Sequence, residues 1–185
     1  MPDYSYTTEA LYRGEKVCGM DLKPETIPCF MTTAFTMRGF KEVQETYATK
    51  GYTYVRTRNP NRTALSEVIS CLEGGEESLI FSSGMGAITS TLMTLLEHGD
   101  HVICNSNIYG ETFKVMTKVL SKCGVEVSFV NFQNYEDIAK AIRPETKLIY
   151  TEVLSNPTLT LVDLGAVADL AHQNGALLVV GNTFT

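Results

Sequence analysis

The sequence predicts an α/β fold built on a parallel sheet. After about residue 60, short apolar runs of β type alternate with segments in which apolar residues recur at helical spacing. Glycine, asparagine, aspartate or proline separates most of these runs. Of the 185 residues, 44% are hydrophobic and 19% are charged, which is typical of a globular chain that buries a sizeable core.

The N-terminal third has a different character. Its first 60 residues show no regular apolar period and are rich in Thr and Tyr. Proline and glycine interrupt this stretch at Pro24, Pro28, Gly39, Gly51 and Pro60. We therefore expect an extended arm over residues 1–60 and an α/β domain over residues 61–185.

The first regular elements follow the arm. Asn59 and Pro60 form a helix cap and first helical position, and Gly74-Gly75 predicts the end of that helix. Its apolar face is formed by Ala64, Leu65, Val68, Ile69 and Leu72. Residues 78–81 predict a buried strand. After the turn 82–86 we expect a helix that ends before Gly99 and carries Leu92, Leu95 and Leu96 inward.

The alternation then repeats to the last residue. We expect further strands at 101–104, 125–130, 147–152 and 176–180. Between them we expect helices at 109–120, 135–142 and 164–174, the last capped by Asp163. Strands that alternate with helices imply right-handed crossovers and a parallel sheet covered on both faces. Ligands of such sheets bind beyond the carboxyl ends of the strands.

Composition excludes several classes of partner. The net charge is −6, which disfavours a nucleic-acid or anionic-membrane surface, because such surfaces need clustered Lys and Arg. No apolar run approaches the roughly 20 residues that span a bilayer. Five widely spaced cysteines without a C-x-x-C pair indicate reduced thiols and no metal site. We expect a cytosolic protein that binds a small molecule or another protein.

The turn around Gly84 is the first candidate site. Small residues at a helix start let backbone N–H groups approach an anion such as a phosphate. A tight turn with close helix packing is the alternative explanation. A dinucleotide site is disfavoured, because Thr89 replaces the third small residue and the next strand ends in Cys104-Asn105 without an acid for a ribose.

Several loops carry short motifs in a defined order. They are Gly51–Pro60, Ser83–Ala87, Tyr109-Gly110, Glu152–Pro157 and Asn182–Phe184. From about residue 25 onward, this arrangement resembles the transsulfuration family of pyridoxal-phosphate enzymes, which includes methionine γ-lyase, cystathionine γ-lyase and cystathionine γ-synthase. The resemblance implies the large domain of the aspartate-aminotransferase type (fold type I), pyridoxal 5′-phosphate as cofactor, and a homo-oligomer that is a dimer of dimers.

The resemblance also assigns residues to the cofactor phosphate. Tyr54 and Arg56 match a Tyr-x-Arg motif that reaches the phosphate across a subunit interface, and a guanidinium pairs with phosphate in bidentate geometry. Ser83, Gly84 and Met85 match the turn whose backbone amides hold the same phosphate. For this turn, the argument from the helix end and the resemblance agree.

Other matches surround the cofactor ring. Tyr109 matches a tyrosine that stacks on the ring and assists proton transfer at the substrate's side chain, and it is the one catalytic residue that we predict. Asn156 matches an amide that contacts the ring's phenolic oxygen, and Glu152 matches a carboxylate that supports the site.

Two departures from the family pattern stand out. The family carries Val-Asp-Asn-Thr where this chain has Val180-Gly181-Asn182-Thr183, and the Asp pairs with the protonated ring nitrogen. The Schiff-base lysine of the family lies in a Ser-x-Thr-Lys motif that does not occur here. We therefore expect an incomplete large domain without the family's C-terminal small domain, in which the strand at 78–81 lacks its usual neighbours.

The expected function is that of a carbon–sulfur lyase or transsulfuration enzyme that acts on a sulfur amino acid. γ-Elimination and γ-replacement both remain open. A non-catalytic remnant or assembly subunit of the same family is the alternative, favoured by Gly181 and by the absent lysine motif. Another fold-type-I enzyme, such as an aminotransferase, is a third possibility that the Tyr-x-Arg and Ser-Gly-Met motifs disfavour.

Overall fold

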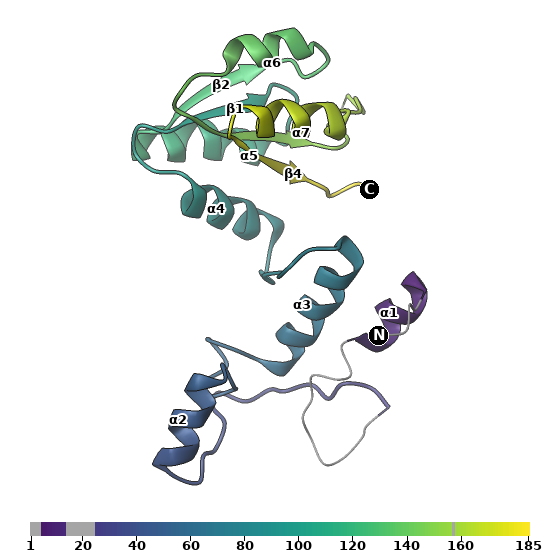
Figure 1. Cartoon of the computed structure of the whole chain (residues 1–185), viewed down its shortest axis with the longest axis vertical. Coiled ribbons are helices and arrows are strands. Elements are labelled where there is room, and N and C mark those ends of the chain that lie inside the picture. Colours follow the sequence, from purple (N-terminus) through teal and green to yellow (C-terminus); the bar gives the residue numbers. More distant parts are fainter. Residues whose placement is uncertain (1–4, 14–24, 157) are drawn as a thin grey trace. The chain divides into compact units, whose positions relative to one another are not determined.

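A computed structural model describes residues 5–13, 25–156 and 158–185 (Figure 1). Cys18, Pro24 and Pro157 lie outside the described residues. The chain divides into two compact units, Met1–Ile80 and Phe81–Thr185. The helix that begins at Pro60 belongs to the first unit, and the expected division into an arm (1–60) and an α/β domain (61–185) stays a prediction.

The first unit contains α1 (Tyr6–Tyr12), α2 (Phe40–Ala48) and α3 (Pro60–Glu73). The expectation of an arm without regular structure is wrong at α1 and α2. None of the residues of α2 is buried, although Phe40, Val43 and Tyr47 recur at helical spacing along it. The first unit thus has two helices that the expectation of an extended arm does not include.

Helix α3 begins and ends as predicted. The Asn59 side chain accepts a hydrogen bond from the Asn61 amide at 2.8 Å, and Gly74 ends the helix with a φ of 64°. Asn59 also donates to the Phe30 carbonyl at 3.1 Å, while Asn61 accepts from the Phe30 amide at 2.8 Å. The two asparagines therefore fix both the helix start and the extended segment beside it.

Residues 78–81 do not form the predicted strand. Leu79 is 77% exposed and Phe81 is 40% exposed, and neither belongs to a β ladder. No strand among the described residues pairs with this segment. The Ser78 carbonyl accepts a hydrogen bond from Ser66 of α3, and the Ser70 and Ser78 hydroxyls lie 2.8 Å apart.

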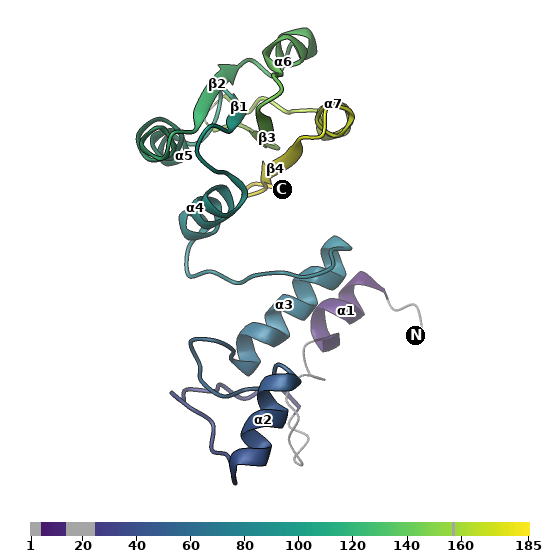
Figure 2. The same ribbon diagram turned by 60° about the vertical axis from the view of Figure 1, so that its left-hand side comes forward.

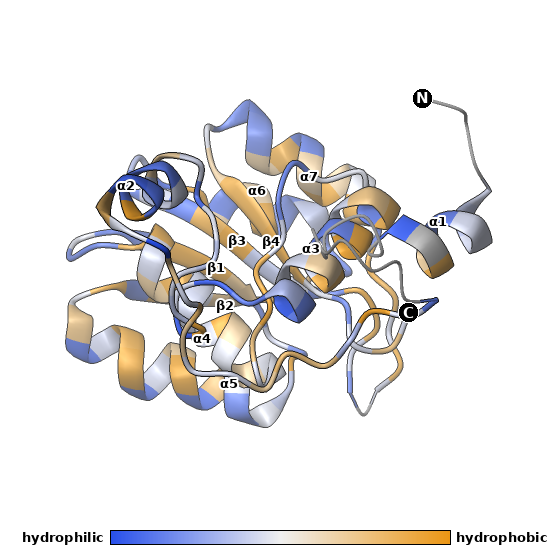
Figure 3. Ribbon diagram, turned by 90° about the horizontal axis from the view of Figure 1, so that it is seen from below, coloured by the Kyte–Doolittle hydropathy of each residue, from blue (hydrophilic) through white to orange (hydrophobic). Residues whose placement is uncertain are grey.

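The second unit is the predicted parallel α/β structure. Its strands are β1 (His101–Asn105), β2 (Glu126–Val130), β3 (Thr146–Glu152) and β4 (Leu177–Gly181), in the order β2-β1-β3-β4. All three pairings are parallel. The four strands predicted over this part of the chain are confirmed to within two residues at each end. In Figure 3 the strands of this sheet are largely orange, because most of their residues are hydrophobic.

Helices cover both faces of the sheet (Figure 2). On one face lie α4 (Gly84–Leu95) and α5 (Gly110–Lys114), which continues as a π turn (Val115–Val119) and a 3₁₀ turn (Leu120–Cys123). On the other face lie α6 (Tyr135–Ala141) and α7 (Leu164–Gln173). Asp163 caps α7 as predicted, accepting from the Ala166 amide.

Two apolar clusters fill these faces. Leu92 and Leu96 of the α4 segment pack with Val102 and Tyr150, whereas Leu95 is 38% exposed, so the prediction that it faces inward is wrong. On the opposite face Ile138, Val167, Ile103 and Ile149 form the core.

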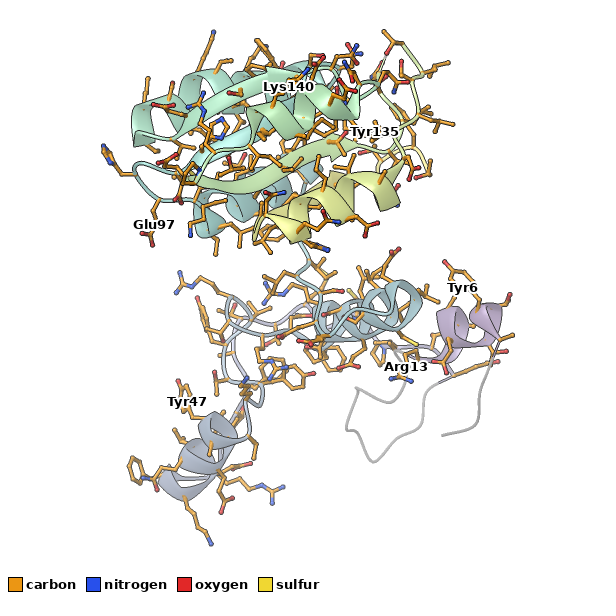
Figure 4. All side chains as sticks on the ribbon, turned by 45° about the horizontal axis from the view of Figure 1, so that its top comes forward. Tyr6, Arg13, Tyr47, Glu97, Tyr135 and Lys140 are labelled. Carbon is orange, nitrogen blue, oxygen red and sulfur yellow. The ribbon has the colours of Figure 1, made fainter. Side chains whose placement is uncertain are left out.

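The outer surface of α6 is charged. Nζ of Lys140 lies 3.6 Å from Oε2 of Glu136 on this surface (Figure 4).

The buried His101, at the start of β1, forms hydrogen bonds with both neighbouring strands, β2 and β3. The imidazole of His101 lies 2.8 Å from the Thr146 hydroxyl and 2.9 Å from the Ser128 hydroxyl. Burial, and then the positive charge of Arg143, lowers the pKa of His101 below its ordinary value of 6.5. The folded chain therefore favours the neutral imidazole.

This arrangement predicts a stability that depends on pH. Below about pH 6.5 the unfolded chain binds a proton at His101 that the folded chain resists, so the free energy of unfolding falls as the pH falls. We expect urea unfolding between about pH 7.5 and about pH 5.5 to show this loss in the wild type and a smaller one in His101→Gln. Parallel curves for the two proteins would contradict the assignment.

Candidate functional site

A cavity of about 230 Å³ lies at the carboxyl ends of β3 and β4. This volume is slightly below the roughly 300 Å³ at which small-molecule sites begin. The structure brings six of the predicted site residues to its wall: Gly84, Met85, Tyr109, Glu152, Asn156 and Gly181. Ile88, Leu154 and Phe184 add apolar surface.

The N-terminus of α4 forms one wall. Ser83 caps the helix, and its hydroxyl accepts from the Gly86 amide at 3.0 Å. Gly84 and Met85 occupy the first two helical positions, where a backbone N–H has no partner within the helix. Two free amides and the positive end of the helix dipole thus meet at the cavity wall, which suits an anion.

A hydrogen bond joins the start of α5 to the end of β3. The Tyr109 amide donates to Oε1 of Glu152 at 2.9 Å. Glu152 is only 8% exposed, and burial raises its pKa above the ordinary 4.5, against the opposing effect of the Tyr109 hydrogen bond. Tyr109 is 45% exposed and lines the cavity, and an aromatic side chain there suits a planar ligand.

Asn156 lies in a loop after β3 that closes on itself. Leu154 and Leu161 form an antiparallel bridge, and the Ser155 amide donates to the Thr160 carbonyl at 3.1 Å. The Ser155 hydroxyl accepts from the Thr160 amide at 3.0 Å. This loop holds Asn156 at the cavity while its side chain stays exposed.

A side chain at position 181 would crowd its neighbours on β3. A Cβ atom there would lie 3.0 Å from the Tyr150 hydroxyl oxygen and 3.1 Å from Cγ of Glu152. Both residues are on β3, and the register places Glu152 beside Gly181. A residue larger than glycine therefore requires these neighbours to shift.

Tyr150 is a site residue that the sequence analysis does not identify. It is fully buried and lines the cavity, yet its hydroxyl has no hydrogen-bond partner among the described residues. Burial raises the pKa of Tyr150 to about 12, and the neighbouring Thr112 hydroxyl opposes this rise. Tyr150 and Glu152 are two residues apart on the predicted strand, so the alternation of side chains places both on one face of the sheet. This alternation does not distinguish Tyr150 from an ordinary core residue.

Tyr54 and Arg56 belong to the first unit, and the cavity is lined by residues of the second. The Arg56 guanidinium carbon lies 5.0 Å from the centroid of the Tyr54 ring, a cation–π arrangement. Arg56 is exposed. Its charge is therefore available to a further partner.

Comparison with known proteins identifies the family. Residues 8–185 match the family described as Cys/Met metabolism PLP-dependent enzyme. The chain belongs to this family. The pyridoxal-phosphate family predicted from the loop motifs is thereby confirmed, as is the fold type. Members of the Cys/Met metabolism family use pyridoxal 5′-phosphate.

Individual relatives differ in activity. The chain is 51% identical over 134 residues to cystathionine gamma-lyase of Bacillus subtilis, covering 72% of this chain and 35% of that protein. It is 43% identical over 159 residues to cystathionine beta-lyase MetC of the same species, covering 86% and 39%. The chain thus spans between a third and two fifths of the length of these relatives.

A solved structure supports the fold assignment. The crystal structure of metY from Campylobacter jejuni, which contains N′-pyridoxyl-lysine-5′-monophosphate, superposes with a TM-score of 0.87 at 25% identity. The match covers 98% of this chain and 44% of that one.

Cavity residues fit the family's cofactor in several respects. Amides at a helix N-terminus suit a phosphate, and the Tyr109 side chain suits an aromatic ring. Over the described ranges, no group of three or more His, Cys, Asp or Glu residues could hold a metal ion. Nor is any helix in those ranges long and apolar enough to cross a membrane.

Glu152 offers a direct test of the site's electrostatics. Because its folded-state pKa is raised, the ionised carboxylate lowers stability at neutral pH. We expect Glu152→Gln, which keeps an acceptor for the Tyr109 amide without the charge, to raise the free energy of unfolding at pH 7 in urea titrations.

Glu152→Ala is the matched control. It removes the acceptor as well as the charge, and it should be less stable than Glu152→Gln by about 1 kcal/mol or more, because an amide loses its partner. Equal stability of the two variants would show that the Tyr109–Glu152 hydrogen bond contributes nothing.

Proposed function

We propose that this chain forms the phosphate- and ring-binding part of a pyridoxal-phosphate enzyme that cleaves or exchanges the carbon–sulfur bond of a sulfur amino acid. The observation that carries the proposal is the convergence of Gly84, Met85, Tyr109, Glu152 and Asn156 on one cavity at the carboxyl edge of a parallel sheet. Relatives with γ-lyase and β-lyase names leave the position of the eliminated bond open.

The phosphate is assigned to the N-terminus of α4. The free amides of Gly84 and Met85 donate to its oxygens, and Ser83 holds the turn in shape. Tyr54 and Arg56 complete this site from a second copy of the chain, so the proposal includes a homo-oligomer. An exposed guanidinium supports it, because such a group forms bidentate pairs with phosphate.

The ring is assigned to the part of the cavity that Tyr109, Glu152 and Asn156 line. Tyr109 would pack on the ring and Asn156 would donate its amide to the phenolic oxygen, while Glu152 fixes Tyr109 through its backbone amide. When bound, the cofactor withdraws electrons from the α-carbon of the amino acid. Tyr109 then donates its hydroxyl proton to the departing sulfur atom, which makes it the catalytic acid of the proposal.

None of the described residues that line the cavity is a lysine. We therefore propose that this chain, by itself, binds pyridoxal phosphate without a covalent bond. The same observation, together with Gly181, favours a second candidate: a non-catalytic assembly subunit that keeps the cofactor site. A cytosolic location belongs to either version of the proposal.

Gly84→Pro tests the phosphate site. Proline is tolerated at the first helical position, and the extended Ser83 backbone (φ −156°, ψ 152°) is compatible with a following proline. The substitution removes one N–H donor. We expect roughly ten- to a hundredfold weaker binding of pyridoxal phosphate in equilibrium dialysis, since a hydrogen bond to a charged group contributes about 1.5–3 kcal/mol.

Gly110→Pro is the matched control. Gly110 is the first residue of α5, the preceding Tyr109 backbone is extended (φ −55°, ψ 134°), and Gly110 does not line the cavity. This variant should bind like the wild type. Pyridoxal without its phosphate should bind the wild type and Gly84→Pro equally. An unchanged affinity of Gly84→Pro for pyridoxal phosphate would remove the phosphate from this helix end.

A further inference from the structure

Glu152 is the one acidic or basic side chain among the described residues that line the cavity. No lysine, arginine or histidine of the described ranges stands in the cavity wall beside it. The ion pairs of the described part of the chain do not include Glu152 either. A carboxylate that is 8% exposed and lacks a cationic partner is unfavourable, because burial removes water from the charge.

One oxygen of this carboxylate is free to meet a ligand. Oε1 accepts the hydrogen bond of the Tyr109 amide at 2.9 Å. Oε2 has no hydrogen-bond partner in the described part of the chain, and it is not among the unpartnered side-chain atoms that the protein encloses completely. Because Glu152 lines the cavity, Oε2 is an acceptor for a donor on a bound molecule.

Glycine at position 181 leaves room beside the carboxylate. The pairing of β3 with β4 sets Gly181 next to Glu152. A Cβ atom at 181 would lie 3.1 Å from Cγ of Glu152, so a side chain there would compete for the space that the carboxylate faces. At this end of the cavity β3 therefore supplies a carboxylate, and position 181 of β4 supplies no side chain.

We propose that Oε2 of Glu152 accepts a hydrogen bond from the protonated ring nitrogen of bound pyridoxal phosphate. This inference rests on the proposed function, which assigns the phosphate to the start of α4 and the phenolic oxygen to Asn156. The phosphate and the phenolic oxygen are acidic, so the ring nitrogen is the polar group of the cofactor that takes up a positive charge. The carboxylate of the cavity and the basic group of the ligand are complementary.

Each partner stabilises the charged form of the other. A cation beside a carboxylate favours its ionised form, and a carboxylate beside a pyridine favours the protonated ring. Burial raises the pKa of Glu152 in the chain, and a positive nitrogen acts in the opposite direction. A protonated ring withdraws electrons more strongly than a neutral one, so this contact supports the chemistry of the proposed function.

A ligand that differs only at the ring nitrogen tests the proposal. The full chain is titrated with pyridoxal phosphate and with its carbocyclic analogue, in which C–H replaces the nitrogen. We expect the wild type to bind pyridoxal phosphate about ten- to a hundredfold more tightly than the analogue, the range of a hydrogen bond to a charged group. In Glu152→Gln this preference should fall about fivefold or more, because the amide carries no charge.

Two controls accompany this variant. Glu152→Gln keeps an acceptor for the Tyr109 amide, so its affinity for the carbocyclic analogue should match that of the wild type and show that the cavity is intact. Glu111→Gln makes the same exchange on α5, at a carboxylate that lies 2.6 Å from Nζ of Lys114 and does not line the cavity. It should retain the preference of the wild type.

A second measurement needs no variant to reveal the pair. The ¹⁵N chemical shift of ring-labelled pyridoxal phosphate distinguishes a protonated pyridine nitrogen from a neutral one. At a pH where the nitrogen of the free cofactor is neutral, we expect a protonated nitrogen on the wild type and a neutral one on Glu152→Gln.

The outcomes separate the inference from the proposed function. If the bound nitrogen is neutral on the wild type, or if Glu152→Gln keeps the full preference, the ring nitrogen does not meet Glu152 while the cofactor site stands. An equal loss of preference in Glu111→Gln would also contradict the inference. If neither compound binds the wild type, the proposed function fails and the inference fails with it.

Discussion

The parallel pairing of β3 with β4 is the constraint on which the site depends. Its register sets Glu152 beside Gly181 at the carboxyl end of both strands, and Tyr150 lies two residues earlier on the same face. The Glu152 carboxylate then reaches across to the Tyr109 amide and fixes the start of α5. A register shift by one residue would turn Tyr150 and Glu152 to the opposite face and leave the cavity without both.

Much of the second unit could be predicted from the sequence because its signals are local. β1 is buried along its whole length, and its run of apolar residues reads as a strand of a parallel sheet. Asp163 in this unit, like Asn59 in the first unit, caps a helix by accepting from an amide only a few residues away, so these caps locate the starts of α7 and α3.

Other features depend on contacts that no local pattern contains. Residues 78–81 have the composition of a strand, but a strand needs a neighbour, and none pairs with them here. Helix α2 is different, because Phe40, Val43 and Tyr47 lie at helical spacing and form a short apolar stripe that a local pattern does contain. For the candidate site, the motif residues around the cavity could be named in advance. Tyr150 could not be singled out, because its unpaired hydroxyl is a property of the packed structure.

The central claim is that a phosphate binds the free amides at the start of α4. Backbone ¹H–¹⁵N resonances of Gly84 and Met85, followed as pyridoxal phosphate is added, test it most directly. A hydrogen bond to an anion moves an amide proton downfield, so we predict downfield shifts at both residues and none at Gly74, which ends α3 in the first unit. Saturable binding that leaves the Gly84 and Met85 resonances in place would contradict the account.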